Sequence, residues 1–170
     1  RENSIFFFFL GAESFVESAI KNGAVHIVAG KKLCESCSVV KNTRKAYSLL
    51  CAAFFKESHK KIKLIGVTGT NGKTTVSSML YHILTMAGRK CALLGTTGYL
   101  HCNENEEADL TTPDPFTMHR MFSEMTECNT EYCIMEASSQ GLFQERLYPL
   151  SFELSVFTNL TAEHLDYHGD

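Results

Sequence analysis

A glycine-rich segment between two apolar patterns constrains the fold of this chain more than any other feature. Residues 66–75 read GVTGTNGKTT and follow an apolar run at residues 62–67, IKLIGV. Residues 74–87 then form a candidate helix that ends at Gly88. Its apolar side chains recur at helical spacing, at Val76, Met79, Leu80, Ile83 and Leu84. The pattern predicts a strand, a tight loop and a helix in direct succession.

Strands and helices are predicted to alternate along the rest of the chain as well. Further candidate strands lie at residues 5–10, 24–29, 90–94, 131–136 and 152–157. Further candidate helices lie at residues 13–22, 43–55 and 141–147, and another follows the TTPDP segment at 111–115 and runs to about residue 127. Near-continuous apolar strands that alternate with helices are typical of an α/β protein, with a mostly parallel sheet and helices on both faces. Ligands of such sheets bind beyond the carboxyl ends of the strands.

Two details of this prediction concern single segments. Thr43 is the predicted N-cap of the helix at residues 43–55. The apolar residues of that helix share one face: Ala46, Leu49, Leu50, Ala53 and Phe54. The acidic stretch from His101 to Asp109 is interpreted as a connection between a strand and the TTPDP segment at residues 111–115.

Composition and charge exclude several classes of protein. The 170 residues carry 16 basic and 19 acidic side chains, a net charge of −3, and no run rich in lysine or arginine. This pattern gives no electrostatic surface for nucleic acid or an anionic membrane. No apolar run reaches the roughly 18 residues of a membrane helix. Hydrophobic residues make up 44% of the chain, which is enough for a buried core.

The cysteines indicate free thiols. Seven cysteines, an odd number at irregular spacing, fit a reducing compartment better than a disulfide framework. Cys34 and Cys37 form a CxxC pair, but no second pair follows at the spacing of a zinc ribbon. Ordinary loop thiols are therefore the favoured interpretation of that pair.

The residue types in the glycine-rich loop suit a polyphosphate. Gly69 and Gly72 allow backbone angles that point successive N–H groups at an anion, and the following helix N-terminus adds partial positive charge. Lys73 is placed to reach the terminal phosphates, and the Thr74 hydroxyl is placed to bind magnesium. Val67 stands where the usual P-loop has its first glycine, which leaves an ordinary strand-to-helix turn as the alternative.

The loop sequence TGTNGKTT resembles that of the Mur ligase family, ATP-dependent enzymes that add amino acids to the peptidoglycan precursor. Four more segments resemble the family in the same order: LTTPD at 110–114, MEASSQGL at 135–142, FQERL at 143–147 and FTNLTAEHLDYHGD at 157–170. Together they resemble the MurE-type branch, which extends the UDP-N-acetylmuramoyl-dipeptide to a tripeptide. Since the chain starts at Arg1 and no strand or helix closes it at Asp170, we expect a fragment of a longer protein.

The resemblance implies two partial domains and a role for each matching residue. Residues 1–58 would be part of an N-terminal UDP-precursor-binding domain, and residues 59–170 the N-terminal part of a central ATP-binding domain, with the C-terminal domain absent. The residues implied to bind ATP are Gly69, Thr70, Asn71, Gly72, Lys73, Thr74, Thr75 and Asn159. Those implied to bind Mg²⁺ are Thr74, Glu136 and His164, and those implied in catalysis are Lys73, Glu136 and His164. Those implied to bind the muramoyl-dipeptide are Thr111, Thr112, Ser138, Gln144 and Arg146.

Several of these residues also have a simpler interpretation. Glu136 would be a strand-end glutamate that faces solvent. His164 would make local hydrogen bonds, since imidazole is not a favoured magnesium ligand. Thr111 and Thr112 would form a turn, and Arg146 would be a solvated helix residue.

The resemblance implies an ATP-dependent ligase that forms an amide bond, with ATP and Mg²⁺ as cofactors. It would add diaminopimelate or lysine to UDP-N-acetylmuramoyl-L-alanyl-D-glutamate through an acyl phosphate. We expect small-molecule substrates, a cytoplasmic location and a monomer, with no nucleic-acid or membrane partner. We expect no ligation by these 170 residues alone. The alternatives are a ligase like folylpolyglutamate synthase and a non-catalytic ATP-binding module.

Overall fold

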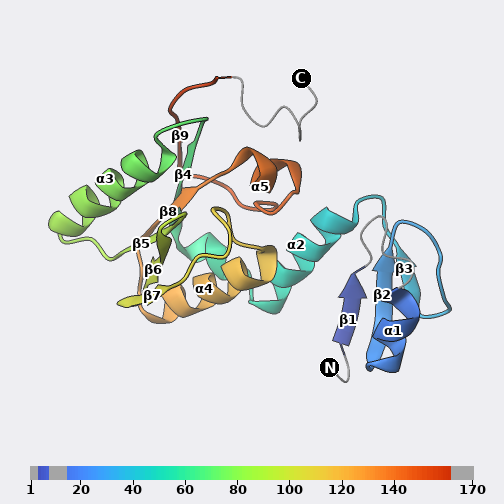
Figure 1. Ribbon diagram of the computed structural model, residues 1–170. Coiled ribbons are helices and arrows are strands. Elements are labelled where there is room, and N and C mark those ends of the chain that lie inside the picture. Colours follow the sequence, from blue (N-terminus) through green and yellow to red (C-terminus); the bar gives the residue numbers. More distant parts are fainter. Residues whose placement is uncertain (1–3, 8–14, 162–170) are drawn as a thin grey trace.

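The computed structural model describes residues 4–7 and 15–161, and the strands in these ranges form two sheets (Figure 1). The larger sheet has the strand order β7-β6-β5-β8-β4-β9. Four of its strands run parallel: β4 (Lys63–Thr68), β5 (Cys91–Gly95), β8 (Tyr132–Glu136) and β9 (Leu154–Phe157). The other two, β6 (Gly98–His101) and β7 (Glu104–Glu106), are antiparallel and extend the edge next to β5.

Helices α3 (Lys73–Met86) and α4 (Pro115–Glu127) cover opposite faces of this sheet (Figure 1). Alternate side chains of each strand point to opposite faces. Thus Leu64 packs with the α4 side chains, whereas the next residue, Ile65, packs with the α3 side chains. The predicted α/β class, with a mostly parallel sheet between helices, is confirmed.

The smaller sheet contains the parallel strands β1 (Ser4–Phe7), β2 (Ala24–Ala29) and β3 (Cys37–Val39). Helix α1 (Val16–Lys21) packs on it through Val16, which shares a core with Ile27 and Ala29. Helix α2 (Thr43–Phe54) lies between this sheet and α4 (Figure 1). None of the helices in the described ranges is long and apolar enough to span a membrane.

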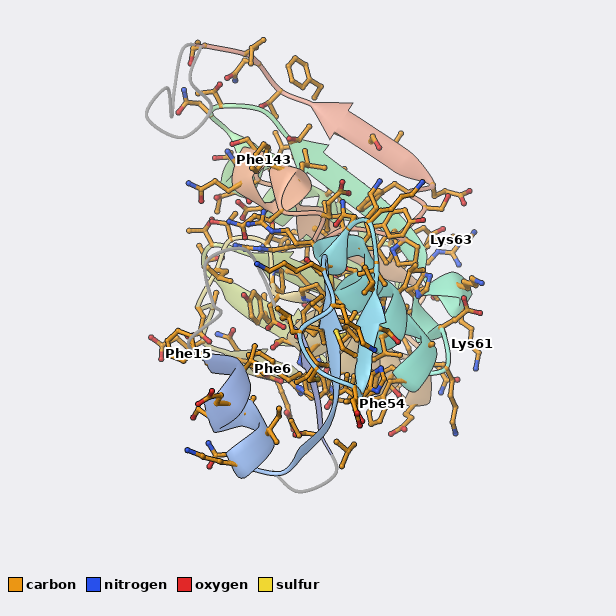
Figure 2. All side chains as sticks on the ribbon, turned by 90° about the vertical axis from the view of Figure 1, so that its right-hand side faces the viewer. Phe6, Phe15, Phe54, Lys61, Lys63 and Phe143 are labelled. Atoms are coloured by element: carbon orange, nitrogen blue, oxygen red, sulfur yellow. A yellow bond between two sulfur atoms is a disulfide. The ribbon has the colours of Figure 1, made fainter. Side chains whose placement is uncertain are left out.

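The structure corrects two predictions about α2. Asn42, rather than Thr43, caps the helix, because its side chain accepts a hydrogen bond from the Lys45 amide. The predicted apolar face is also not the buried one. Phe54, labelled in Figure 2, is 72% exposed, whereas the buried residues are Ser48, Cys51 and Ala52. The Ser48 hydroxyl donates to the carbonyl of Glu145 at 2.9 Å, and the ring of Phe54 lies 6.4 Å from that of Phe116 in α4.

The acidic stretch after β6 is not a simple connection. Part of it forms β7, the second strand of a hairpin, which pairs with β6. Cys102 and Asn103 form the turn between the two strands. Both turn residues have a positive φ, 51° and 65°. The stretch was not predicted as a strand because its side chains are polar and only one edge of β7 is paired.

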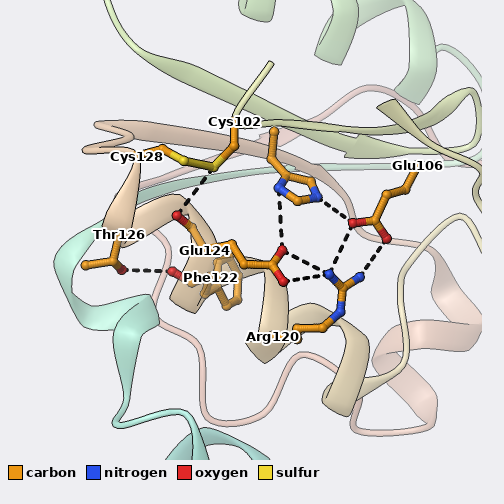
Figure 3. A network of polar contacts seen from close by, with 8 residues as sticks. Cys102, Glu106, Arg120, Phe122, Glu124, Thr126 and Cys128 are labelled. Carbon is orange, nitrogen blue, oxygen red and sulfur yellow. Dashed lines mark hydrogen bonds and ion pairs between the residues drawn. A yellow bond between two sulfur atoms is a disulfide. The ribbon is translucent and has the colours of Figure 1, made fainter. Parts of the chain in front are cut away.

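A charged cluster and a disulfide attach this hairpin to α4 (Figure 3). The guanidinium of Arg120 donates to Glu106 at 2.6 Å and to Glu124 at 2.8 Å, and the Arg120 hydrogen bond lowers the pKa of Glu106. Cys102 is disulfide-bonded to Cys128, with the two Cα atoms 5.7 Å apart. The expectation of free thiols is therefore wrong for this pair, although the other cysteines are free.

Removing the disulfide is expected to destabilise the fold. The bond closes a loop across 26 residues of sequence separation, so Cys102→Ser/Cys128→Ser should lower the free energy of unfolding by roughly 3–4 kcal/mol. Urea unfolding in oxidising and reducing buffer measures this effect. Cys34→Ser, which replaces a free thiol, serves as the control and should leave the response to reductant unchanged. Equal stability of the native protein in both buffers would contradict the prediction.

Two buried histidines lie between the short 3₁₀ helix η2 (Ser58–Lys61) and α4. The rings of His59 and His119 are 5.1 Å apart, and neither nitrogen of His119 has a hydrogen-bond partner in the described structure. Burial, with a smaller contribution from His59, lowers the pKa of His119 from 6.5 to about 4. Burial lowers the pKa of His59 as well. Both rings are thus packed in the neutral form.

This pair predicts a loss of stability in mild acid. Below pH 6.5 the unfolded chain binds a proton at His119 that the folded chain does not bind until about pH 4. The free energy of unfolding should therefore fall as the pH drops through this window, by roughly 3 kcal/mol for His119. Thermal or urea unfolding at pH 4 to 7 measures the slope. His119→Phe should flatten it, whereas His82→Asn, at an exposed histidine, should not.

Candidate active site

The glycine-rich loop connects β4 to α3 and has, at two positions, a backbone conformation that favours glycine. Gly69 has φ +129°, and a Cβ there would overlap Thr158 Oγ1 and lie 2.8 Å from the carbonyl oxygen of Asn159. Gly72, the N-cap of α3, has φ +86°, in the left-handed region. The loop therefore packs tightly against the segment that follows β9.

Hydrogen bonds from that segment to the backbone of the loop hold the loop in place. The Asn159 side chain accepts a hydrogen bond from the Asn71 amide at 3.0 Å and donates to the Asn71 carbonyl at 2.9 Å. The Thr70 amide donates to the Asn159 carbonyl at 2.9 Å. Asn159, predicted to lie near a nucleotide, thus lies beside the loop and fixes its shape.

Lys73 starts helix α3 and places its charge over the loop. Its ammonium donates to the carbonyl oxygens of Gly69 at 2.7 Å and Thr70 at 2.9 Å. Thr74 and Thr75 follow in the first turn of the helix, where Thr75 is exposed. The ammonium and the positive end of the helix dipole therefore lie at the same point of the sheet edge.

Glu136 ends β8, which pairs directly with β4, and its side chain is only 1% exposed. It does not face solvent, contrary to the simpler interpretation. Its carboxylate accepts hydrogen bonds from the Thr74 hydroxyl at 3.0 Å, the Thr96 amide at 3.1 Å and the Thr96 hydroxyl at 3.1 Å. Gly95 makes room for it, because a Cβ there would overlap the carboxylate oxygen Oε1.

The oxygens beside the loop fit a hard divalent cation. A buried carboxylate and a hydroxyl whose oxygens are 3.0 Å apart are ligands of the kind that Mg²⁺ binds. Thr74 and Glu136, two of the three predicted magnesium ligands, are thus in contact. The third, His164, lies outside the described residues.

The residues predicted to bind the dipeptide form a group beside Glu136. The Thr112 hydroxyl is fully buried: it donates to the Glu136 carbonyl at 2.8 Å and accepts from the Ser138 amide at 2.9 Å. Arg146 donates to the Thr112 carbonyl at 2.8 Å and to the Gln144 side chain at 2.6 Å. Thr112 therefore holds the segment in place, while Ser138, Gln144 and Arg146 are only partly buried.

Thr96 belongs to this site although the sequence reasoning did not identify it. It directly follows β5, and its hydroxyl lies 3.1 Å from Glu136 and 3.2 Å from the Thr111 hydroxyl. The available signal was its position, because β5 is a parallel strand of the sheet and its carboxyl end lies at the same edge as the loop. No charged or unusual residue type marked it.

A lysine- and hydroxyl-bearing loop beside a buried carboxylate, at the carboxyl edge of a parallel sheet, is typical of proteins that bind nucleoside triphosphates. Residues 67–170 match the model of the Mur ligase middle domain. The chain belongs to the Mur ligase family, whose members are ATP-dependent.

Two curated relatives have the same name, UDP-N-acetylmuramoyl-L-alanyl-D-glutamate--2,6-diaminopimelate ligase. The one from Parabacteroides distasonis is 42% identical over 160 residues, which cover 91% of this chain and 33% of that protein. The one from Clostridium acetobutylicum is 39% identical over 175 residues, covering 98% and 36%. The chain thus spans roughly a third of the length of these curated relatives.

Solved structures have the same fold. A structure of a UDP-N-acetylmuramoyl-L-alanyl-D-glutamate--2,6-diaminopimelate ligase matches all of this chain with a TM-score of 0.87 at 28% identity, and the match covers 36% of that protein. MurF ligase from Thermotoga maritima also matches all of the chain, over 38% of its own length, with a TM-score of 0.57 at 20% identity. The second likeness shows the fold alone.

Proposed function

We propose that this chain is part of an ATP-dependent ligase that adds 2,6-diaminopimelate to UDP-N-acetylmuramoyl-L-alanyl-D-glutamate. The names of the relatives support the substrates. The observation that carries the proposal is the contact between Thr74 and Glu136, because it joins the candidate phosphate loop to the group around Thr112. We assign residues 1–58 to a domain that binds the UDP-precursor and residues 59–170 to the ATP-binding domain.

In this proposal the loop residues hold the phosphates of ATP. The N–H groups in the first turn of α3, with Thr74 and Thr75, surround the anion, whereas the Thr70 and Asn71 amides bind Asn159, which keeps the loop in shape. Lys73 exchanges its two loop carbonyl contacts for the terminal phosphates. Thr74 and Glu136, with His164 as a further ligand, hold Mg²⁺, which when bound neutralises phosphate charge during the transfer.

The second substrate binds on the other side of Glu136. Arg146 and Gln144 present a guanidinium and an amide, and Thr111 and Ser138 present hydroxyls, which suit the carboxylates and amides of a muramoyl-dipeptide. Thr112 positions this group from inside. A substrate carboxylate held here lies next to the phosphate loop, so that phosphoryl transfer and then attack by an amine gain from proximity.

The proposal also covers the compartment, the oligomeric state and the partners of the enzyme. We propose that it is a cytoplasmic monomer that acts on small molecules and has no nucleic-acid or membrane partner.

Calorimetry on the full-length gene product tests the proposal. We expect binding of both Mg·ATP and UDP-N-acetylmuramoyl-L-alanyl-D-glutamate, and release of ADP that depends on 2,6-diaminopimelate. Binding of ATP without the dipeptide would instead indicate a non-catalytic module, and ADP release that depends on a folate would indicate a polyglutamate-adding ligase. The 170-residue chain by itself should form no tripeptide.

A further inference from the structure

Thr96 connects the two halves of the candidate site. Its amide and its hydroxyl both contact the Glu136 carboxylate, at 3.1 Å each, and the same hydroxyl lies 3.2 Å from that of Thr111. Thr111 belongs to the group proposed to bind the dipeptide, and Glu136 to the pair proposed to bind the cation. Among the described residues, Thr96 is the side chain whose hydroxyl contacts both.

The hydroxyl of Thr96 can serve only one of these partners as a donor. A hydroxyl has one proton and two lone pairs, whereas an ionised carboxylate can only accept. While Thr96 donates to Glu136, it can accept from Thr111, and the Thr111 proton is then directed at Thr96. When Thr96 donates to Thr111 instead, the Thr111 proton is released for another acceptor. The three groups thus have two alternative hydrogen-bond arrangements.

We propose that Thr96 couples occupancy of the cation site to substrate binding at Thr111; this inference rests on the proposed function. A cation held by Thr74 and Glu136 competes for the carboxylate lone pairs that accept from Thr96. Thr96 then donates to Thr111, and Thr111 donates to a carboxylate or carbonyl oxygen of the dipeptide substrate. Because coupling between two ligands is reciprocal, each should strengthen binding of the other.

Thr96 is well placed for a clean test. It is exposed and lies outside the sheet core, so that valine can replace it with little change in volume. It acts through Glu136 and Thr111 and is therefore a positioning residue. Thr97, the next residue and likewise exposed, provides a matched control.

The experiment measures the dissociation constant of UDP-N-acetylmuramoyl-L-alanyl-D-glutamate by calorimetry, with and without Mg²⁺ and a non-hydrolysable ATP analogue. In the native full-length protein we expect the nucleotide to tighten dipeptide binding about tenfold. Thr96→Val should reduce this enhancement to below about twofold. Thr96→Ser, which keeps the hydroxyl, and Thr97→Val should both retain the full enhancement.

Other outcomes overturn the inference. Full enhancement in Thr96→Val, or none in the native protein although both ligands bind, refutes the coupling and leaves the proposed function standing. Failure of the native protein to bind either ligand refutes the proposed function itself. If Thr96→Val lowers the melting temperature, Thr96→Ala replaces it, and Thr96→Ser remains informative, because loss of enhancement with the hydroxyl present also refutes the proposal.

Discussion

Lys73→Met should weaken binding of Mg·ATP by roughly 100-fold or more, because it removes charge-assisted hydrogen bonds that a methionine of similar length cannot make. In the structure the ammonium makes two hydrogen bonds of 2.7 and 2.9 Å to the loop carbonyls, and its charge lies beside the N-terminus of α3. No other lysine or arginine lies within the loop at residues 66–75. Calorimetric titration with a non-hydrolysable ATP analogue measures the change.

The control for this variant lies on the same strand-loop-helix unit. Lys63 begins β4, at the end of the strand opposite the loop, and is exposed. Lys63→Met should leave nucleotide affinity within about twofold, since its charge is more than a Debye length of about 10 Å from the loop along an extended strand. Equal loss in both variants would show that the lysine in the loop does not bind the nucleotide.

Glu136→Gln should slow ligation by roughly 100-fold or more and remove the dependence of nucleotide binding on Mg²⁺. The carboxylate accepts from three donors, the Thr74 hydroxyl and the amide and hydroxyl of Thr96. A glutamine places an NH₂ donor among these donors and carries no charge for the cation. Nucleotide titrations over a range of Mg²⁺ concentrations measure the effect apart from activity.

Glu131→Gln is the matched control for this second variant. Glu131 directly precedes β8, the strand that Glu136 ends, but it is exposed and pairs with Arg89 at 3.2 Å. Its replacement should change neither rate nor magnesium dependence measurably. A Glu136→Gln enzyme that keeps its magnesium response would mean that the cation binds elsewhere.

The central part of the fold was predictable because its signals are local. Strand β4 and helix α3 lie within one residue of their predicted ranges, and Gly88 follows the helix with φ +77° as expected. A period of 3.6 residues and two glycines specify that unit without reference to the rest of the chain. The contact of Thr74 with Glu136 also follows, since parallel strands end at one edge.

The remaining features depend on contacts between distant segments. The buried face of α2 is set by contacts with distant segments, such as that of Ser48 with Glu145, and not by its own pattern, so that Leu49, Leu50 and Phe54 stay exposed. The partnership of Cys102 with Cys128 requires the hairpin turn to meet the end of α4. No sequence pattern marked Thr96, because a threonine after a strand is common. Its importance comes from its contacts with Thr111 and Glu136.

The disulfide between the hairpin and α4 changes what a protease can release. The stretch from Asn103 to Asp109 is mostly exposed and lies between the two bonded cysteines, as do Thr111 and Thr112. A cut in this stretch leaves both pieces covalently joined, so the nicked protein migrates as one band on a gel without reductant and as two bands with it. The segment proposed to hold the dipeptide therefore stays covalently attached to the N-terminal piece, through α4 and the disulfide, even when the chain before it is cut.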